Sequence, residues 1–554
     1  MHPILSAAPF NLSPADVAWV ETTLASLTPA ARVGQLFNLG SWGDDPGEPA
    51  RLAALQPGGV TRFFGADADR ELAFLDGVRA GAKIPPLLSA DLEGSRMSLS
   101  FGTEVPNPLA LAAIDDEAAS RDIARIMAEE AVALGLNWSF TPVLDINAAF
   151  RSPIVATRAF GSDQATIRRH ALTQAAVFQA HGVAATVKHF PGEGHDDRDQ
   201  HLVTTINPLS LDEWEESHGA LYRAAIQAGV LSVMSAHIAF PAFVRSLDPD
   251  AGLEAFRPAS LSAVLNVELL RKHLGFNGVI VSDASEMAGL TSWCRAEDSK
   301  PEIIANGCDM ILFSRAPEAD MAAVAAAIAS GALPEARVDA ALTRVLGLKA
   351  ALGLHRKATA PLAARKEALG TATNRAAARA VTARAPTLVK DVQGLLPLSP
   401  DRHRRVLIYS GGIISPLHRD PQAFALPGML EREGFAVTLH APDTVVTREN
   451  FDLVLYLFGE ETLLTRGRIF LDWARISGNF IAAMQRHWHD IPTAMISFGY
   501  PYYLYDAPRV PTYVNAYATM DTMQEAVVDC LLGRAPWNRH NPVDPFCGLE
   551  DARY

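Results

Sequence analysis

The chain has 554 residues, of which 49% are hydrophobic, and a formal net charge of −14. This length exceeds what one ordinary hydrophobic core holds and predicts two domains, one of them a large barrel. The acidic balance argues against a nucleic-acid partner, which would need a basic surface patch. The sequence also has no run of about 18–20 apolar residues, the length that would predict a membrane-spanning helix.

The N-terminus and the cysteines indicate the compartment. The first twenty residues lack the basic segment and the continuous apolar run of a secretory signal peptide. The four cysteines are widely scattered, without a CxxC pair or zinc-ligand spacing; they are Cys294, Cys308, Cys530 and Cys547. We therefore expect a cytoplasmic protein with reduced thiols, and we expect no metal and no cofactor.

Strand-like and helix-like runs alternate over the first 350 residues, after two N-terminal helices that open at Ser13-Pro14 and Thr28-Pro29. The expected strands are residues 59–64, 86–90, 138–143, 184–189, 231–237, 278–282 and 310–313. The helices expected between them include residues 116–134, 164–181, 211–228 and 317–330. Such repeated alternation predicts a parallel sheet, and we expect a (β/α)8 barrel over residues 1–355, although only seven strands are evident.

The composition changes after the barrel. Residues 356–385, rich in Ala, Arg, Lys and Thr, are predicted to form a linker and a connecting helix. A second alternation fills residues 386–554, with strands expected at 406–410, 436–440, 453–458, 493–498 and 512–516 and helices at 426–433, 470–488 and 520–532. This pattern predicts a smaller doubly wound α/β sandwich domain. Gly411-Gly412 lacks the GxGxxG spacing of a dinucleotide site, so we expect a plain turn there.

Polar or charged residues follow most of the strands predicted for the barrel. Barrel enzymes build their active sites at the carboxyl ends of the strands. The residues at these ends are Asp91, Glu93, Arg96, Asp145, Asn147, Lys188, His189, His237 and Asp283. One such residue is usually a structural hydrogen-bonding group, but five strand ends that all carry them favour a shared functional site.

The densest group lies in residues 188–201, KHFPGEGHDDRDQH, which hold three histidines, three aspartates, a glutamate, a lysine and an arginine. Such crowding just past an apolar strand favours function over a solvated charge run. The glycines on either side of Glu193 predict a loop that is mobile enough to close over a ligand. The acidic residues alone do not have the spacing of a metal-ligand triad.

This loop resembles the KHFPGHG…DSH loop of glycoside hydrolase family 3. The likeness is greatest to the β-N-acetylglucosaminidase branch, which takes its general acid/base from an Asp-x-His pair. The resemblance implies that Asp199 and His201 form this dyad. The sequence departs from the family pattern at Glu193, where His is usual, and at Gln200, where Ser is usual.

Two further segments carry the resemblance. GVIVSD, residues 278–283, resembles the family's GVVVSDD, which implies that Asp283 is the nucleophile; Ala284 replaces the second Asp. SADLEGSRM resembles a D-x-E-G-x-R segment, which implies that Asp91 accepts hydrogen bonds from sugar hydroxyls. The stretch ISFGYPYYLYDAPRVPTYVNAY resembles the family's second domain, so the resemblance covers nearly the whole chain.

Other residues are expected to line the sugar site. Arg158, in ATRAFGSD, resembles the family's R-S-F-G, and with Lys188 and His189 it would donate hydrogen bonds to hydroxyls of the terminal sugar. An internal salt bridge is the alternative for Arg158. Glu193 is a candidate sugar ligand, with an ion pair to Arg198 or Lys188 as the alternative. The last candidate is His237, while Asp145 is interpreted as mainly structural.

These motifs predict an exo-acting retaining glycoside hydrolase that releases terminal β-linked N-acetylglucosamine through a glycosyl-enzyme on Asp283. The alternatives are a β-glucosidase of the same family, a non-catalytic sugar-binding protein, and a β-N-acetylglucosaminide phosphorylase. The phosphorylase is considered because a neutral His repels phosphate less than a carboxylate does. The expected partner is an amino-sugar glycoside, with no nucleic acid and no membrane; a homodimer is left open.

Overall fold

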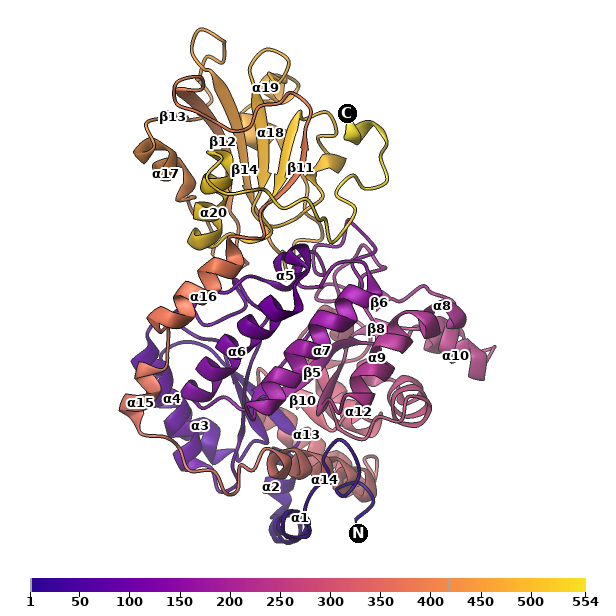
Figure 1. The fold of residues 1–554 in the computed structure, drawn as a ribbon. Helices are drawn as coiled ribbons and strands as arrows, with labels where there is room; N and C mark the ends of the chain where they lie inside the picture. Colours follow the sequence, from indigo (N-terminus) through magenta and orange to yellow (C-terminus); the bar gives the residue numbers. More distant parts are fainter. Residues whose placement is uncertain (1, 417) are drawn as a thin grey trace. The chain divides into compact units, whose positions relative to one another are not determined.

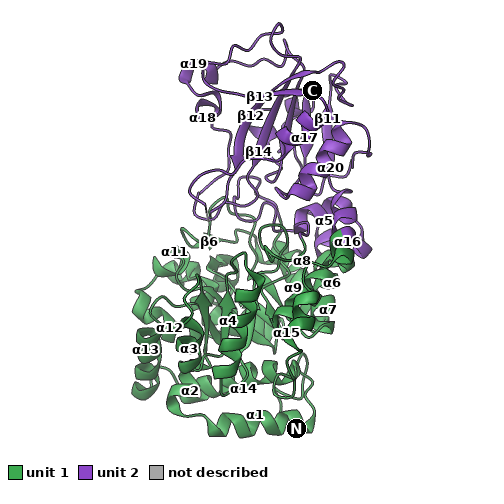
Figure 2. Cartoon of the chain, turned by 90° about the vertical axis from the view of Figure 1, so that its left-hand side faces the viewer, with its two compact units in different colours: residues 1–103, 120–146, 168–375 green, residues 104–119, 147–167, 376–554 purple. Residues whose placement is uncertain are grey.

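A computed structural model describes residues 2–416 and 418–554. Two compact units are distinguished by their internal contacts (Figure 2). The barrel unit comprises Met1–Thr103, Ser120–Ile146 and Arg168–Arg375, and the α/β unit comprises Glu104–Ala119, Asn147–Ile167 and Ala376–Tyr554. Both units are therefore discontinuous in sequence. The domain limits placed near residues 355 and 386 stay a prediction.

The barrel unit contains a closed barrel of eight parallel strands in the order β1-β10-β9-β7-β5-β4-β3-β2. The strands are β1 (Phe37–Ser41), β2 (Gly59–Arg62), β3 (Leu87–Ala90), β4 (Trp138–Ser139), β5 (Ala184–Phe190), β7 (Ser232–Ser235), β9 (Val279–Ala284) and β10 (Met310–Leu312). The predicted (β/α)8 barrel is confirmed, and all seven predicted strands are present. The strand that the sequence did not reveal is β1, which pairs with β10 and β2 and closes the barrel.

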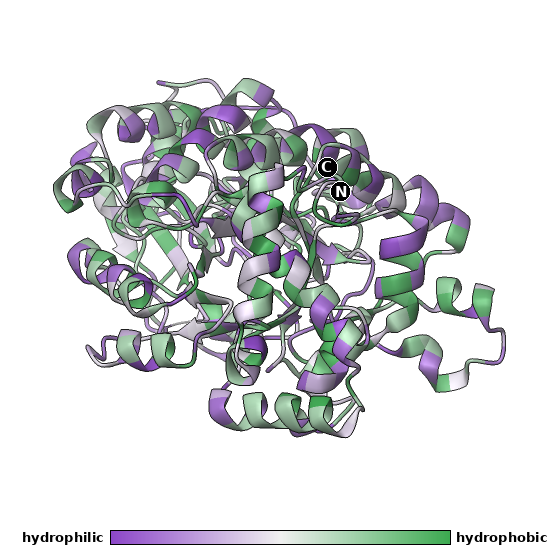
Figure 3. Cartoon of the chain, turned by 90° about the horizontal axis from the view of Figure 1, so that it is seen from below, coloured by the Kyte–Doolittle hydropathy of each residue, from purple (hydrophilic) through white to green (hydrophobic). Residues whose placement is uncertain are grey.

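Helices alternate with these strands along the chain (Figure 1). They are α1 (Pro14–Ser26), α2 (Pro29–Gly34), α3 (Glu48–Ala54), α4 (Ala68–Gly81), α6 (Glu117–Leu134), α7 (Gln164–Ala180), α8 (Leu211–Glu216), α9 (His218–Gln227), α10 (Pro241–Leu247), α11 (Ala288–Thr291), α12 (Ala296–Ala305), α13 (Pro317–Ser330), α14 (Glu335–Ala351), α15 (Leu362–Glu367) and α16 (Ala372–Thr382). Short helical segments are η1 (Gly252–Phe256), η2 (Ala259–Leu261) and η3 (Val264–His273). Hydrophilic and hydrophobic residues alternate along the helices (Figure 3), as expected where one helix face packs inward.

Local sequence explains where these helices begin and break. The hydroxyl of Ser13 accepts a hydrogen bond from the N–H of Asp16 at the start of α1, as predicted from Ser13-Pro14. The single helix predicted over residues 211–228 is wrong: Ser217, at φ −113° and ψ −97°, separates α8 from α9. Among the described residues, no helix combines the length and the apolar character needed to cross a bilayer.

The barrel interior is packed with apolar side chains. Trp138, Ala184, Val279 and Met310, from four of the strands, are fully buried in one core cluster. The indole N–H of Trp138 donates to the hydroxyl of Thr186 over 2.7 Å, so the largest of these side chains has its polar atom satisfied. A short parallel pair, β6 (Thr205–Ile206) and β8 (Ile238–Ala239), lies outside the barrel sheet.

The α/β unit has a six-stranded sheet in the order β11-β16-β15-β14-β12-β13. Its strands are β11 (Thr387–Asp391), β12 (Arg405–Ile413), β13 (Ala436–Leu439), β14 (Leu453–Gly459), β15 (Thr493–Ser497) and β16 (Thr512–Asn515). Its helical segments are α5 (Pro108–Ile114), α17 (Leu426–Arg432), α18 (Trp473–Ser477), α19 (Phe480–Ala483), α20 (Asp521–Leu531), η4 (Tyr503–Tyr505) and η5 (Asp551–Arg553). Five strands are parallel and β11 is antiparallel to β16, so the predicted α/β sandwich domain is confirmed.

Two expectations for this unit are wrong. The long helix predicted over residues 470–488 is instead α18 and α19, because Gly478 takes the left-handed conformation (φ +80°) and Asn479 caps α19. Gly411-Gly412 is not a plain turn. It belongs to β12, where the register shifts between Ser410 and Gly412, and Gly412 has φ +73°.

Candidate active site

The loop after β5 contains a hydrogen-bonded pair of Asp199 and His201. Nδ1 of His201 lies 2.7 Å from Oδ1 of Asp199, and the backbone N–H of His201 donates to the same oxygen over 2.8 Å. The carboxylate of Asp199 is fully buried, while 23% of the His201 side chain is exposed. Because Nδ1 faces the carboxylate, Nε2 is the ring nitrogen directed away from Asp199 and suited to exchange a proton with a ligand.

Asp283 lies in β9, the strand whose end forms part of the carboxyl face of the barrel. Its Oδ1 accepts a hydrogen bond of 2.7 Å from the N–H of Ala284. Burial alone would raise the pKa of Asp283, but three nearby histidines and this N–H outweigh it, so the pKa is lowered from the usual 3.8. The histidines are His189, His237 and His201. Asp283 is therefore ionised at neutral pH, as a nucleophilic carboxylate must be.

A buried lysine joins the ends of β3 and β5. Nζ of Lys188 lies 2.8 Å from Oδ1 of Asp91 and 2.6 Å from Oε1 of Glu93. The side chains of Lys188 and Glu93 are buried, but 20% of the Asp91 side chain is exposed. Asp91 is thus held in place by an ammonium group while part of its carboxylate remains accessible. The role of Asp91 as an acceptor for sugar hydroxyls stays a prediction.

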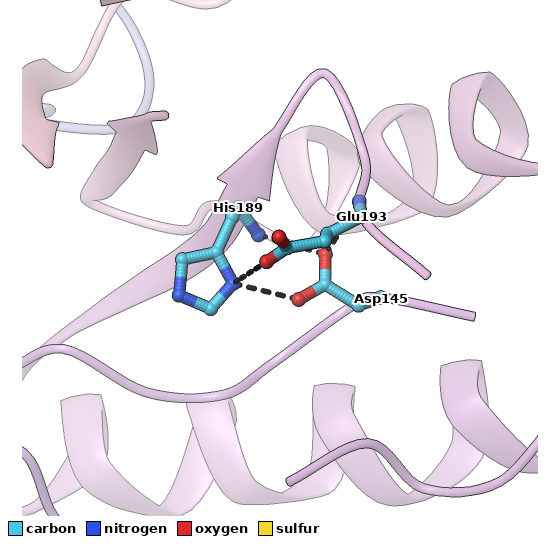
Figure 4. Close-up of side chains that lie close together, drawn as sticks. All are labelled: Asp145, His189 and Glu193. Atoms are coloured by element: carbon cyan, nitrogen blue, oxygen red, sulfur yellow. Dashed lines mark hydrogen bonds and ion pairs between the residues drawn. The ribbon is translucent and has the colours of Figure 1, made fainter. Parts of the chain in front are cut away.

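Asp145 organises the first turn of the loop (Figure 4). Its Oδ2 lies 2.6 Å from Nδ1 of His189, and its Oδ1 accepts the backbone N–H groups of His189 and Glu193, each over 3.0 Å. Burial would raise the pKa of Asp145, but the contacts with His189 and the two N–H donors lower it overall. Asp145 therefore has the contacts of a structural residue that fixes the His189 ring through Nδ1.

Asp145, His189 and Glu193 each present one atom of a metal-ligand type, and these atoms lie within 4.8 Å of one another. Oε2 of Glu193 is 3.9 Å from Nδ1 of His189, on the same side as the Asp145 carboxylate (Figure 4). The same Nδ1 already contacts Asp145 at hydrogen-bonding distance, and Oε2 of Glu193 accepts a hydrogen bond from Gln200. Hydrogen bonds thus engage both oxygens of Asp145 and one oxygen of Glu193.

His237 has both ring nitrogens in hydrogen bonds. Nε2 lies 2.9 Å from the carbonyl oxygen of Ala284, and Nδ1 lies 2.8 Å from the hydroxyl of Ser260. Since a carbonyl only accepts, Nε2 carries the proton and Nδ1 accepts from Ser260. Burial lowers the pKa of His237, so the ring is neutral. The ring supports the backbone next to Asp283, and its expected place in the sugar pocket stays a prediction.

The loop glycines allow close backbone packing. Gly192 and Gly194 have φ values of +125° and +112°. A Cβ on Gly194 would lie 1.8 Å from the carbonyl oxygen of Ile146, and one on Gly192 would lie 2.3 Å from Nδ1 of His218. The indole N–H of Trp214 also donates to the carbonyl of Pro191 over 2.8 Å. The mobility expected from these glycines stays a prediction.

The chain is similar to known proteins over nearly its whole length. The model of the glycosyl hydrolase family 3 N-terminal domain matches residues 46–348, more than half of the chain. A β-N-acetylglucosaminidase/β-glucosidase from Cellulomonas fimi is 40% identical over 565 residues, covering 99% of both chains. The chain belongs to glycoside hydrolase family 3. It is an enzyme that acts on glycosidic bonds of a carbohydrate substrate.

Other family 3 relatives differ in their reported reactions. A β-hexosaminidase from Vibrio cholerae is 33% identical over 268 residues, covering 47% of this chain and 76% of its own. The solved structure of the β-glucoside phosphorylase BglX has a TM-score of 0.91 and 34% identity, covering 99% of each chain. That of a family 3 β-N-acetylglucosaminidase from Paenibacillus sp. has a TM-score of 0.79 and 25% identity, covering 95% of this chain and all of that one.

Three candidate cations of this family 3 enzyme have the following places. Arg158 lies in the α/β unit, while the other candidate residues lie in the barrel unit. Arg198 pairs with Asp196, and Lys188 pairs with Asp91 and Glu93. The sequence marked Gln200 only as a departure from the family, although its side chain is fully buried within the site.

Proposed function

We propose that this family 3 enzyme is an exo-acting retaining glycosidase that releases terminal β-linked N-acetylglucosamine by double displacement. The observation that carries the proposal is the 2.7 Å contact between Nδ1 of His201 and Asp199, in the same unit as the ionised carboxylate of Asp283. A retaining glycosidase needs one nucleophilic carboxylate and one group that first donates and then accepts a proton. Asp283 and His201 supply these two functions.

In the first step, the carboxylate of Asp283 attacks the anomeric carbon and forms a covalent bond to the sugar. The bond to the leaving oxygen breaks, and that oxygen takes the proton from Nε2 of His201. His201 enters this step as an imidazolium, which the buried carboxylate of Asp199 stabilises and orients. In the second step the neutral imidazole takes a proton from water, which attacks the anomeric carbon and releases Asp283.

Sugar binding is assigned to the neighbouring strand ends. Asp91 accepts hydrogen bonds from hydroxyl groups, and Lys188, which holds Asp91, has an ammonium group that donates only. His189, whose Nδ1 is fixed by Asp145, is proposed to donate a hydrogen bond to the sugar from Nε2. Arg158 is proposed as a further donor. The N-acetylglucosamine preference is supported by the name of the relative from Cellulomonas fimi, which also includes β-glucosidase.

A second candidate is phosphorolysis, in which phosphate replaces water in the second step. It is favoured by the end-to-end likeness to the β-glucoside phosphorylase at 34% identity. The acid/base is also an imidazole, which is neutral once it has protonated the leaving group and does not repel an incoming anion as a second carboxylate would. Phosphate oxygen would attack the anomeric carbon, release Asp283 and give a sugar 1-phosphate with retained configuration.

The test compares p-nitrophenyl β-N-acetylglucosaminide with the β-glucoside, each with and without phosphate, and identifies the products by NMR. The proposal predicts higher kcat/KM for the N-acetylglucosaminide and a first-formed product in the β configuration. A clear preference for the glucoside would overturn the substrate assignment. An α product from the β substrate would overturn double displacement. Sugar 1-phosphate as the main product would establish the second candidate.

We also propose a cytoplasmic location. All four cysteines are free thiols in the structure, and the cytoplasm keeps such thiols reduced. Fractionation of the producing cells, followed by detection of the intact chain, tests this assignment; recovery of the enzyme mainly outside the cytoplasm would contradict it.

A further inference from the structure

We propose that Glu193 and Gln200 are positioning residues: they form a buried pair that sets the place of the acid/base dyad relative to the nucleophile strand. This inference rests on the proposed double displacement and deepens it. Glu193 then acts through Gln200. The sequence instead suggests that Glu193 binds the sugar. These are also the two places in the loop at which the sequence departs from the family pattern.

The side-chain amide of Gln200 bridges two parts of the site. Its Nε2 donates to Oε2 of Glu193 over 3.0 Å, and its Oε1 accepts the backbone N–H of His237 over 3.0 Å. Gln200 has no exposed surface, and Glu193 is 3% exposed. Gln200 also stands between Asp199 and His201 in the chain. The buried amide therefore anchors the chain segment that carries both members of the dyad.

Both ends of the bridge are fixed. At one end, the N–H of Glu193 donates to Asp145 over 3.0 Å, and its carbonyl accepts the N–H of Ile146 over 3.2 Å. At the other end, the ring of His237 donates from Nε2 to the carbonyl of Ala284, next to Asp283. A continuous set of hydrogen bonds thus runs from the loop after β4, through Gln200, to the strand that carries the nucleophile.

The backbone of the dyad is held from a second direction by α11, the helix that follows the nucleophile strand. The N–H of Gly289 donates to the carbonyl of Gln200 over 3.2 Å, and the N–H of Ala288 donates to that of His201 over 3.0 Å. A Cβ on Gly289 would lie 2.3 Å from the carbonyl oxygen of Gln200. The segment is therefore confined between α11 and the Glu193 bridge, which determines how close His201 comes to Asp283.

This positioning matters because double displacement depends on a short, fixed separation between the nucleophile and the acid/base. A misplacement of about 1 Å can lower an enzymatic rate by about 10²-fold. Loss of the bridge should therefore reduce the steps that need proton transfer more than it reduces sugar binding. The expected signature is a lower kcat with little change in KM.

Three variants separate positioning from other roles. Glu193→Gln keeps an acceptor for Gln200 and removes the charge. Gln200→Glu places two carboxylates at hydrogen-bonding distance, which are compatible only while they share a proton. The exchange Glu193→Gln/Gln200→Glu reverses donor and acceptor, keeps the net charge of the pair, and leaves a carboxylate oxygen to accept the N–H of His237.

The pH dependence of kcat in Gln200→Glu, compared with its melting temperature at the same pH values, separates positioning from a general loss of stability. Like charge raises the pKa of a paired carboxylate, so the pair shares a proton at low pH and repels at high pH. The activity of Gln200→Glu relative to wild type should therefore fall as pH rises. Other titratable groups around the pair are Asp145, His189, Tyr222, Asp199, His201 and His237.

The experiment measures kcat and KM on an N-acetylglucosaminide and on a glucosaminide between pH 5 and 8, with melting temperatures as a control for folding. We expect Gln200→Glu to lose about 10²-fold in kcat at pH 8, to recover toward pH 5, and to be rescued by the exchange variant. We expect Glu193→Gln to leave the ratio of kcat/KM for the two substrates unchanged.

A pH-independent effect of Gln200→Glu, or an exchange variant as impaired as Gln200→Glu, would overturn the proposal. So would a shift of the substrate ratio in Glu193→Gln, which would place Glu193 at the sugar. Trapping of a glycosyl-enzyme on Asp283 of the wild type distinguishes failure of the proposed function from failure of the positioning proposal. Without that adduct the proposed function fails. If the adduct forms but the variants behave like wild type, only the positioning assignment fails.

Discussion

Asp199→Asn isolates the contribution of the dyad carboxylate. Asp199 is fully buried, and one of its oxygens accepts both Nδ1–H and the backbone N–H of His201, at 2.7 and 2.8 Å. The amide oxygen of Asn can accept the same two hydrogen bonds, so the ring orientation and tautomer are kept. What the variant loses is the negative charge that stabilises the imidazolium.

The size of this loss follows from the type of hydrogen bond. A hydrogen bond to a charged group contributes about 1.5–3 kcal/mol and a neutral one about 0.5–1.5 kcal/mol, so the loss of charge alone costs about 1–1.5 kcal/mol. Because about 1.36 kcal/mol corresponds to tenfold in rate, we expect kcat/KM to fall by roughly 5- to 13-fold for substrates with poor leaving groups. Aryl glycosides with very acidic leaving groups need little protonation, so their first step should be nearly unaffected.

The assay is a leaving-group series of aryl β-N-acetylglucosaminides measured with wild type and Asp199→Asn. The variant should show a steeper dependence of kcat/KM on leaving-group acidity, and a burst with the most acidic member because the second step is slowed. Asp197→Asn, an exposed residue of the same loop, is the control and should match wild type. Equal slopes for wild type and Asp199→Asn would refute the assignment of Asp199 to proton transfer.

Three further predictions concern the surroundings of the dyad. Because the pKa of Asp283 is lowered from 3.8, it stays ionised above that value, so the acid limb of kcat/KM that it causes should lie below pH 3.8; a limb from Asp283 above that pH would contradict the environment described. Lys188→Met should lower the free energy of unfolding by about 3–5 kcal/mol and raise KM, because it removes a cation that pairs with the buried Glu93. An unchanged urea unfolding curve would contradict this. Gly194→Ala should destabilise the enzyme by more than about 1 kcal/mol, because Gly194 has a positive φ and an added Cβ would overlap with Ile146. The matched control is Gly229→Ala, at φ +80° with no atom within 4 Å of the added Cβ. Equal melting temperatures of the two variants would contradict the packing argument.

The alternation of apolar runs was enough to predict both units but not every strand. Strand β1 was missed because Asn38 interrupts its apolar pattern. In the barrel, Asn38 is buried and donates to the hydroxyl of Ser89 over 2.9 Å, while Thr61 donates to its Oδ1 over 3.1 Å. The polar side chain of Asn38 has its hydrogen-bond partners on neighbouring strands, and a single run of sequence does not reveal those partners.

Strand β11 in the α/β unit was likewise not predicted. Its Lys390 is polar, but the ammonium group is buried and donates to the carbonyls of Pro508 and Ala552, each over 2.7 Å. The break between α18 and α19 was marked in the sequence by Gly478-Asn479, which the predicted helix ran through. Local apolar periodicity outweighed that signal in the prediction.

For the site, residue types and motifs identified the groups but not their pairing. The spacing of Asp199 and His201 indicated a dyad, and the structure joins them through one oxygen. The contacts of Gln200 with Glu193 and with His237 span 7 and 37 positions of the chain. Pairings of that kind depend on how the strand ends meet, so the sequence alone could not assign them.

The most direct test of double displacement is to identify the covalent intermediate. The enzyme is incubated with a slow fluorinated glycosyl donor of N-acetylglucosamine, digested, and analysed by mass spectrometry. The account predicts one modified peptide, with the sugar attached to Asp283, and no modified peptide in Asp283→Asn. A sugar attached to another residue, or turnover of the donor without any covalent adduct in the wild type, would contradict it.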